Sequence, residues 1–353
     1  MKHVSIAEFS HGEGERLIAF WRAEYIEHQI EPREPRPGLL IADAGFAQVT
    51  VEVVQTSCRI EIACVEESTL PDMRTGISRH MVEFDPALPA LAWSGNAEAG
   101  ALPPTFAAAE VVGCEPVGAS WWRMTLGTDA AGYARFSSDD HWHFRLLRPR
   151  LTGRDPVWPR LDGNGVIVWP ETDDALTDRV FTIRDCDAER QTVTFDIFRH
   201  PGGPTCDWAE TVPLGQKVGL MGPGAKAGPR IEAEGDRLLV GGDETSVPAI
   251  LRGLERLPSH AVGEIVLLVG SEADRTISSA PGVQLSWLLR SEGATEDTLV
   301  TEMRRRLGHD QKAVGTTRLW FAASKAAARS LRAFAQDEAG LDKSRVHSVA
   351  YWS

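Results

Sequence analysis

The chain has 353 residues, too many for a single hydrophobic core, so its length predicts two or three domains. Its composition, with 42% hydrophobic and 25% charged residues, is ordinary for a soluble globular protein, and no apolar run is long enough to span a membrane. The formal net charge of −13 argues against nucleic-acid binding, because phosphate backbones require a basic surface.

The first part of the chain predicts a small α/β unit. Residues 11–30 and 70–84 place apolar side chains at helical spacing. Between them, residues 45–54 and 57–65 alternate polar and apolar side chains, as the two strands of a hairpin do. Residues 85–106 are rich in proline, glycine and alanine and predict a linker.

From about residue 109 the pattern changes to short strands separated by turn residues. Six stretches recur at the spacing of a hairpin and predict a small antiparallel β-barrel. These stretches are "VVGCEPVGASWWRMTL", "DHWHFRLLRP", "GVIVWP", "DRVFTIRDCD", "QTVTFDIFRH" and "QKVGLMGPG". His141 and His143 could chelate a metal, but they fit better as two histidines on one face of a strand, so we predict no metal site.

From about residue 236 the strands become continuous apolar runs, as buried parallel strands require. These runs are "DRLLVGG", "GEIVLLVG", "VQLSWLL" and "TRLWFAAS", with helical stretches between them. Strands that alternate with helices predict an open parallel α/β sheet. The predicted fold is therefore multidomain α+β: a small N-terminal α/β domain of unknown role at 1–88, a linker at 89–108, a six-stranded antiparallel β-barrel at 109–230 and a parallel-sheet α/β domain at 231–353.

A barrel followed by such a sheet is the order of a flavin domain and a pyridine-nucleotide domain, and "RVFTIR" (179–184) fits the first of these. Arg179 and Phe181 lie two apart on one strand and point to the same face. Arg179 could contact a pyrophosphate while Phe181 lies against a flavin ring and Thr182 meets its edge. The alternative is a barrel strand with arginines at its rim.

Two further motifs place glycines where anionic groups bind. "FRHPGGPTCDWAE" (198–210) predicts a glycine turn before a helix, whose first backbone N–H groups attract phosphate. The alternative is a surface turn with Thr205 as an N-cap. "LLVGGDETSVPAI" (238–250) runs from a buried strand into a glycine pair, which lets a nucleotide approach the strand end. It is not a G-x-G-x-x-G motif, and it could also be a plain strand–helix turn.

Together and in this order, these motifs resemble the siderophore-interacting proteins, which are FAD-dependent ferric-siderophore reductases of the ferredoxin-reductase superfamily. The matching stretches are "HFRLLRP", "RVFTIR", "FRHPGGPTCDWA", "VGLMGPG", "GGDETSVPAI" and the terminal "AYW". The resemblance covers residues 109 to 353. The N-terminal unit more weakly resembles a small domain of unknown function that sometimes precedes these reductases.

The resemblance implies FAD, NADH or NADPH as the electron donor, and a ferric siderophore whose Fe(III) is reduced by single electrons. It assigns Phe181 and Thr182 to catalysis and Arg145 to the substrate, although Arg145 could instead be a rim arginine paired to a carboxylate. The cofactor-binding residues it implies are Arg179, Phe181, Thr182, Ile183, His200, Gly203, Pro204, Thr205, Cys206, Trp208, Gly242, Asp243, Glu244, Thr245 and Trp352.

Three positions depart from the family pattern. Phe181 stands where the family has a tyrosine, and Cys206 stands where the family often has a serine. The stretch "FAASKAA" (321–327) stands where the family usually has a Gly-Glu pair. Tyr351 or Trp352 is expected near the flavin, with plain packing as the alternative. Two other functions stay open: a flavin reductase with another acceptor, and a non-catalytic siderophore-binding flavoprotein. Five cysteines without a C-x-x-C pair, and a first segment unlike a signal peptide, predict a cytoplasmic protein.

Overall fold

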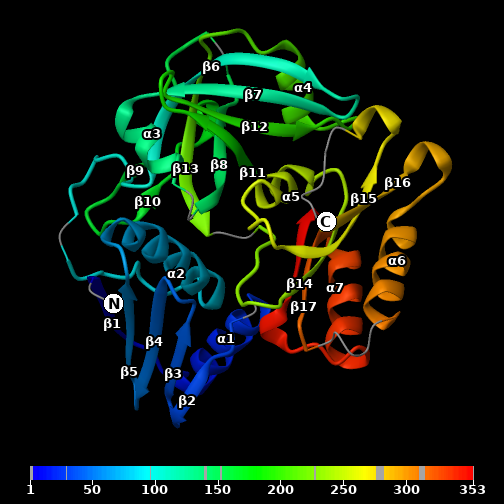
Figure 1. Ribbon diagram of the computed structural model, residues 1–353. Helices are drawn as coiled ribbons and strands as arrows, with labels where there is room; N and C mark the ends of the chain where they lie inside the picture. Colours follow the sequence, from blue (N-terminus) through cyan, green and yellow to red (C-terminus); the bar gives the residue numbers. More distant parts are fainter. Residues whose placement is uncertain are drawn as a thin grey trace. The chain divides into compact units, whose positions relative to one another are not determined.

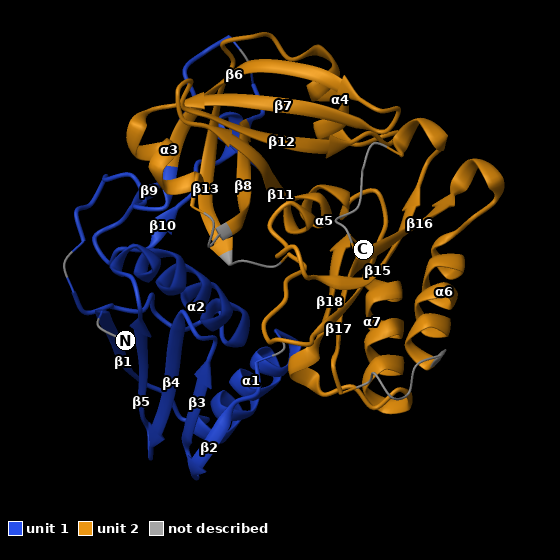
Figure 2. Ribbon diagram, in the orientation of Figure 1, with its two compact units in different colours: residues 1–106, 149–177 blue, residues 107–148, 178–353 orange. Residues whose placement is uncertain are grey.

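The computed structural model divides into two compact units (Figures 1 and 2). Unit 1 contains residues 1–106 and 149–177, and unit 2 contains residues 107–148 and 178–353. Residues 149–177 thus belong to unit 1 although they lie inside the predicted barrel range, and the domain boundaries given above stay a prediction. The residues that the structure describes are 3–28, 30–95, 97–138, 141–151, 153–225, 228–275, 282–309 and 315–352.

Unit 1 is built on an antiparallel sheet with the strand order β1-β5-β4-β3-β2. Its elements are β1 (His3–Ser10), α1 (Gly14–Glu27), β2 (Arg33–Arg36), β3 (Leu39–Asp43), β4 (Ala47–Val54), β5 (Ser57–Cys64) and α2 (Leu70–Phe84). The two predicted helices and the predicted hairpin β4–β5 are present. Three further strands flank the hairpin, so the unit has a larger sheet than the sequence predicted.

The helices of unit 1 bury the faces that their spacing predicted. Leu17, Trp21 and Tyr25 of α1 and Ile77 and Met81 of α2 are all buried in one core with the sheet. Residues at intervals of three and four share one face of a helix, so these side chains meet the sheet together. The polar faces of the helices are left outside that core.

Unit 2 begins with a closed six-stranded barrel in the order β11-β12-β7-β6-β13-β8, counted over the described residues. Its elements are β6 (Phe106–Val117), β7 (Trp121–Thr128), α3 (Ala130–Phe136), β8 (His141–Pro149), β11 (Leu176–Asp187), β12 (Thr192–Phe198), α4 (Pro204–Thr211) and β13 (Lys217–Ala225). The prediction of a six-stranded barrel is confirmed.

Two of the stretches assigned to the barrel were wrong in detail. The first predicted strand, beginning "VVGCEP", is a hairpin of two barrel strands, β6 and β7. The stretch "GVIVWP" is not in the barrel: its strand β10 (Ile167–Val168) pairs with β9 (Arg160–Leu161) as a separate two-stranded sheet. The strand count was right because these two errors cancel.

The second part of unit 2 is a parallel sheet in the order β16-β15-β14-β17-β18. Its elements are β14 (Arg237–Gly242), α5 (Val247–Leu254), β15 (Val262–Val269), β16 (Val283–Leu289), α6 (Glu296–His309), β17 (Thr317–Ser324), α7 (Lys325–Ala333) and β18 (Val346–Trp352). The four predicted strands are present, and β18, which contains the terminal "AYW", is a fifth. The fold class predicted from the sequence is confirmed.

The strand order locates the edge of this sheet where a ligand would bind. β14 is central, with β15 and β16 on one side and β17 and β18 on the other. The chain order therefore reverses at β14, and open α/β sheets bind ligands at the carboxyl ends of the strands at such a point. The carboxyl end of β14 is Gly242, at the motif predicted to meet a nucleotide. None of the helices that the structure describes is long and apolar enough to cross a membrane.

Candidate functional site

The strand β11 presents its predicted residues in three different environments. Arg179 is exposed, Phe181 is half-buried and Thr182 is buried. The Phe181 ring packs against Phe195, with ring centres 4.9 Å apart, and so belongs partly to the barrel core. Ile183 is fully buried in that core. The ring of Phe181 thus keeps only part of its surface accessible to a flavin.

Arg148 of β8, which sequence reasoning did not single out, joins two of the predicted motifs. Its guanidinium lies 5.4 Å from the centre of the Trp208 ring on α4, a cation–π contact. Burial, and then the positive charge of Arg179, lower the pKa of Arg148. Two like charges that repel each other favour an anion between or beside them. The stretch "HFRLLRP" contains Arg148, but only its partners in space make the residue conspicuous.

The glycine turn before α4 takes the predicted form of a helix start. Gly203 is the N-cap and Pro204 the first helical residue, so Thr205 is not the N-cap of the alternative interpretation. A Cβ built on Gly203 would lie 2.6 Å from the His200 ring, which leaves no room for a side chain. Glycine at this position therefore lets the turn pack closely against His200, and the first backbone N–H groups of the helix are of the kind that attract an anion.

Two of the predicted cofactor residues on α4 are engaged in packing. Cys206 is buried, and its thiol donates to the Phe198 carbonyl at 2.8 Å. The indole of Trp208 is buried as well and donates to Gln216 at 3.3 Å. These contacts fix α4 to the barrel, so both residues hold the turn in place.

Thr182 faces a histidine and a tyrosine outside the barrel core. Its hydroxyl lies 3.3 Å from His143 Nδ1, and the His143 and Tyr351 rings meet edge to face at 6.0 Å between centres. Burial, and then the charge of Arg252, lower the pKa of His143 to about 4, so the imidazole is neutral at neutral pH. The sequence identified His143 only as a strand residue, and the side chain of His141 lies outside the described residues.

Arg252 connects α5, a helix that follows the first strand of the parallel sheet, to the barrel strand β11. It is 2% exposed and donates to the backbone carbonyl of Ile183 at 2.7 Å. Its guanidinium also lies 5.1 Å from the centre of the Trp142 ring. A fully buried cation bonded to a strand carbonyl fixes β11 in place, and nothing in the spacing of "SVPAILRGLERL" indicated that role.

The carboxyl end of β14 brings together three predicted residues. Asp243 is 1% exposed and accepts the backbone N–H of Thr245 at 3.0 Å and the indole N–H of Trp352 at 2.7 Å. Burial raises the pKa of Asp243. A Cβ on Gly242 would lie 1.9 Å from Ser246 Oγ, so the strand end requires glycine there. Trp352 itself is 46% exposed and leaves an aromatic face beside this carboxylate.

Glu244 is neutralised by an arginine that the sequence did not single out. Arg290 donates to both carboxylate oxygens of Glu244, at 2.7 and 2.9 Å, and Glu244 is 2% exposed. The backbone carbonyl of Glu244 accepts the indole N–H of Trp121 at 3.1 Å. The motif "DET" thus ties the sheet to the barrel hairpin as well as forming the strand end.

The unusual "FAAS" segment ends β17 beside a carboxylate from another element. Ser324 donates its backbone N–H and its hydroxyl to Glu296 of α6, at 2.9 and 2.7 Å. The sequence has no glutamate next to this strand end, yet the fold supplies one. A carboxylate therefore lies at this edge of the sheet although the stretch "FAASKAA" contains none.

Arg145 has the carboxylate partner that the alternative interpretation, a rim arginine, predicted. Its guanidinium is paired with the carboxylate of Asp178 on β11. Both side chains are largely exposed, so the pair contributes little to stability. A role of Arg145 toward substrate stays a prediction.

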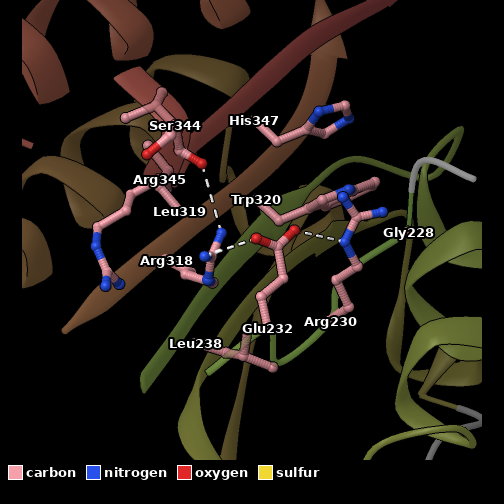
Figure 3. Close-up of a pocket in the computed structure, with 11 residues that line it drawn as sticks. Gly228, Arg230, Glu232, Leu238, Arg318, Leu319, Trp320, Ser344, Arg345 and His347 are labelled. Atoms are coloured by element: carbon pink, nitrogen blue, oxygen red, sulfur yellow. Dashed lines mark hydrogen bonds and ion pairs between the residues drawn. The ribbon is translucent and has the colours of Figure 1, made fainter. Parts of the chain in front are cut away.

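Figure 3 shows a pocket of about 140 Å³ at the opposite, amino-terminal edge of the parallel sheet. Leu238, Leu319 and Val346, near the starts of their strands, line it. Its cations are balanced: Arg318 and Arg230 both pair with Glu232, at 2.6 and 2.7 Å. None of the predicted site residues lies in this pocket, so we assign it no ligand.

The comparison with family models identifies both parts of unit 2. A siderophore-interacting FAD-binding domain matches residues 110–227, and a siderophore-interacting protein model matches residues 235–353. The first contains β11 and the glycine turn, and the second contains the strand ends of the parallel sheet.

Relatives and solved structures agree with this match. Ferric vibriobactin reductase of Vibrio cholerae is 28% identical over 233 residues, 65% of this chain and 83% of that protein. A Mycobacterium tuberculosis protein without an assigned activity is 31% identical over 186 residues, but the match covers 49% of this chain and only 64% of that relative. A siderophore utilization protein from T. fusca is 26% identical with a TM-score of 0.57, covering 70% of this chain and 92% of the other.

The barrel and the parallel sheet together define a flavoprotein of the ferredoxin-reductase fold. Within that class, the chain belongs to the siderophore-interacting protein family, as its motifs predicted.

Proposed function

We propose that the protein is an FAD-dependent ferric-siderophore reductase that takes electrons from NADH or NADPH. The observation that carries the proposal is the convergence of Arg148, Arg179 and α4, which forms a cationic site beside the flavin strand. The proposal is supported by the ferric vibriobactin reductase of Vibrio cholerae, which is similar over 83% of its length.

The residues present fit the two ends of FAD. The pyrophosphate requires cations and backbone N–H groups, and these are supplied by Arg148, Arg179 and the helix start at Gly203. The flat ring requires an apolar contact and a polar edge, for which Phe181 and Thr182 are the candidates. Trp352 and Tyr351 offer further aromatic surface on the side of the parallel sheet.

The chain's own residues position and shield the reacting groups. FAD, when bound, supplies the hydride acceptance and the single-electron transfer that the side chains cannot perform. Thr182 and the neutral His143 form the polar edge of the site, and Tyr351 covers them from solvent. Gly242 lets Ser246 pack directly against the strand end, at the carboxyl edge of the sheet where the nucleotide would bind.

In this proposal, reduction of the siderophore iron releases it from its chelator. Fe(III) is a hard ion held by hard oxygen ligands, and Fe(II) is softer and binds the same chelator more weakly. The siderophore iron is therefore substrate and needs no protein ligand. None of the five cysteines, all of them described, forms a disulfide, which supports a reducing, cytoplasmic setting.

The experiment that tests this function is an absorption spectrum followed by anaerobic titration. We expect the purified protein to be yellow with one FAD per chain, to bleach with NADH or NADPH, and to recover its colour when a ferric siderophore is added. Bleaching followed by recovery only with a free flavin or a protein acceptor would favour the alternative of a flavin reductase with another acceptor. A yellow protein that no nucleotide bleaches would favour the siderophore-binding flavoprotein. A colourless protein that FAD does not reconstitute would exclude all three.

Replacing Arg179 with alanine is expected to weaken FAD binding about ten- to hundredfold. A charge-assisted hydrogen bond contributes roughly 1.5–3 kcal/mol, which corresponds to that change in affinity. Arg190→Ala is the matched control, because it removes the same charge from the exposed turn after β11. Flavin fluorescence titration of the apoproteins gives both dissociation constants. Equal losses in the two variants would show that net charge, and not the position of Arg179, holds the cofactor.

A further inference from the structure

Four ligand-type side chains meet on the two helices of unit 1, and none of them has a role in the proposed function. Glu24 and His28 lie four residues apart at the end of α1, and His80 and Glu83 lie three apart on α2. Both spacings place side chains on the same face of a helix. The Trp21 and His80 rings, 5.8 Å apart between centres, show that the two helices contact each other here (Figure 1).

The donor atoms of three of these residues, Glu24, His28 and His80, gather around one point. One ligand atom each from Glu24, His28 and His80 lies within 4.8 Å of the other two. His80 Nδ1 lies 3.2 Å from a Glu24 carboxylate oxygen and 3.1 Å from a Glu83 oxygen. The rings of His28 and His80 are 5.9 Å apart between centres. These separations approach the spacing of about 3.3–3.5 Å between ligand atoms around a tetrahedral ion with bonds of about 2.0–2.2 Å.

An ion pair alone explains this arrangement poorly. Two carboxylates approach the same ring nitrogen, which can offer at most one proton, and the two negative groups repel each other. The imidazole of His28, beside them, adds a further lone pair but no negative charge. A cation between Glu24, His28 and His80 would satisfy these three groups at once, and Glu83 meets the same His80 nitrogen.

The burial of the four side chains is suited to a bound ion. His80 and Glu24 are largely shielded, with 15% and 21% of their side chains exposed, and they sit over the packed Trp21 and Met81. Glu83 and His28 are exposed, which leaves a path from solvent. Two ligands are therefore held by the core, and two can close over an entering ion.

We propose that unit 1 binds a divalent first-row transition-metal ion through Glu24, His28 and His80, with Glu83 as a fourth ligand. Two imidazole nitrogens and two carboxylate oxygens suit Zn²⁺, Fe²⁺ and their neighbours, and suit Mg²⁺ or Ca²⁺ badly. The ion links α1 to α2 and gives unit 1 a binding function. This inference goes beyond the proposed reductase activity and does not depend on it. The sequence analysis predicted no metal site because each helix alone carries only two of the ligands.

Metal binding by the full-length protein tests the proposal. By isothermal titration calorimetry we expect one Zn²⁺ per chain, with affinities in the order Zn²⁺, Fe²⁺ (measured anaerobically), Mn²⁺ and then Mg²⁺. Binding should weaken as the pH is lowered, because protons compete with the metal ion for its ligands. Zn²⁺ should also raise the melting temperature of the protein.

Variants of the two histidines decide whether these residues form the site. His80→Ala and His28→Ala should each lower Zn²⁺ affinity at least tenfold, since loss of a mere outer-shell partner costs about ten- to hundredfold. His28 is exposed, so its variant stays informative if His80→Ala does not fold. His3→Ala is the matched control, a partly exposed histidine of the same unit that faces the single carboxylate Glu67 at 3.8 Å. Zn²⁺ affinity unchanged by His28→Ala, an equal loss in His3→Ala, or Mg²⁺ binding as tight as Zn²⁺ would overturn the proposal.

Discussion

Arg252→Ala is expected to lower the free energy of unfolding by about 3–5 kcal/mol. The side chain is 2% exposed, donates to the Ile183 and Ser138 carbonyls at 2.7 and 3.3 Å, and covers the Trp142 ring. Truncation leaves a buried carbonyl without this donor and a cavity the size of a long side chain. Urea unfolding at neutral pH, followed by tryptophan fluorescence, measures the loss.

Two further variants separate the causes of this expected loss. Arg252→Met keeps most of the volume, so its difference from alanine measures the cavity and the remainder measures the polar contacts. Arg256→Ala is the control: Arg256 also approaches Trp142, at 5.9 Å, but it is exposed. We expect the control to lose less than about 1 kcal/mol. An equal loss in Arg256→Ala and Arg252→Ala would contradict the role given to the Ile183 bond.

Arg252 also illustrates which parts of the site a sequence can predict. Arg179, the Gly203 turn and the strand end at Gly242 are local motifs, because each needs only its chain neighbours to form a strand, a helix start or an open strand end. Arg148 and Arg252 gain their importance from partners far along the chain. Their roles could not be read from spacing, since an arginine on a helix or strand is usually a solvated side chain.

The same distinction holds for the fold. β14, β15 and β17 are largely buried strands, and their continuous apolar runs predicted them; the run "VQLSWLL" also predicted β16, although this edge strand is only partly buried. β2, with the sequence "REPR", is exposed throughout and contains a proline, so it has no pattern to recognise. β10 is a two-residue strand whose apolar letters resembled a barrel strand. Its pairing with β9, and not its composition, excludes it from the barrel.

The Glu296–Ser324 contact shows how the fold can restore what the sequence lacks. The family pattern led us to look for an acidic residue next to β17, and "FAAS" has none. The carboxylate comes from the start of α6 and caps the strand end through two hydrogen bonds. A linear motif therefore does not record a chemical group that another element of the fold brings to the same place.

The stability of the protein is expected to fall by several kcal/mol as the pH drops from about 6.5 to about 4. Burial, and then neighbouring positive charges, lower the pKa values of His143 and His347 to about 4 in the folded protein. Among the described residues, His347 Nε2 has no hydrogen-bond partner, so a proton there would gain nothing to offset its burial. Lowering a histidine pKa from about 6.5 to about 4 corresponds to roughly 3.4 kcal/mol.

The direction follows from which state binds protons. Between pH 6.5 and 4 the unfolded chain protonates both histidines and the folded protein does not, so acid favours unfolding. This stability is complete above the unfolded pKa of about 6.5 and is lost as the pH falls to the folded value of about 4. Asp236 loses its contribution at lower pH, because hydrogen bonds from Arg345 and Arg318 outweigh burial and hold its pKa well below its usual range. The loss of stability above pH 4.5 therefore reports mainly on the two histidines.

Replacing both histidines with glutamine tests this assignment, because an amide keeps a polar side chain but takes up no proton in this range. Urea unfolding at pH 7 and pH 4.5 should show a clear loss of stability in the wild-type protein and a much smaller loss in the His143→Gln/His347→Gln variant. His260→Gln, which removes an exposed histidine of the same unit, should retain the wild-type loss. If the double variant loses as much stability as the wild type, the buried imidazoles are not the groups that acid protonates, and the neutral state of His143 beside Thr182 would need another explanation.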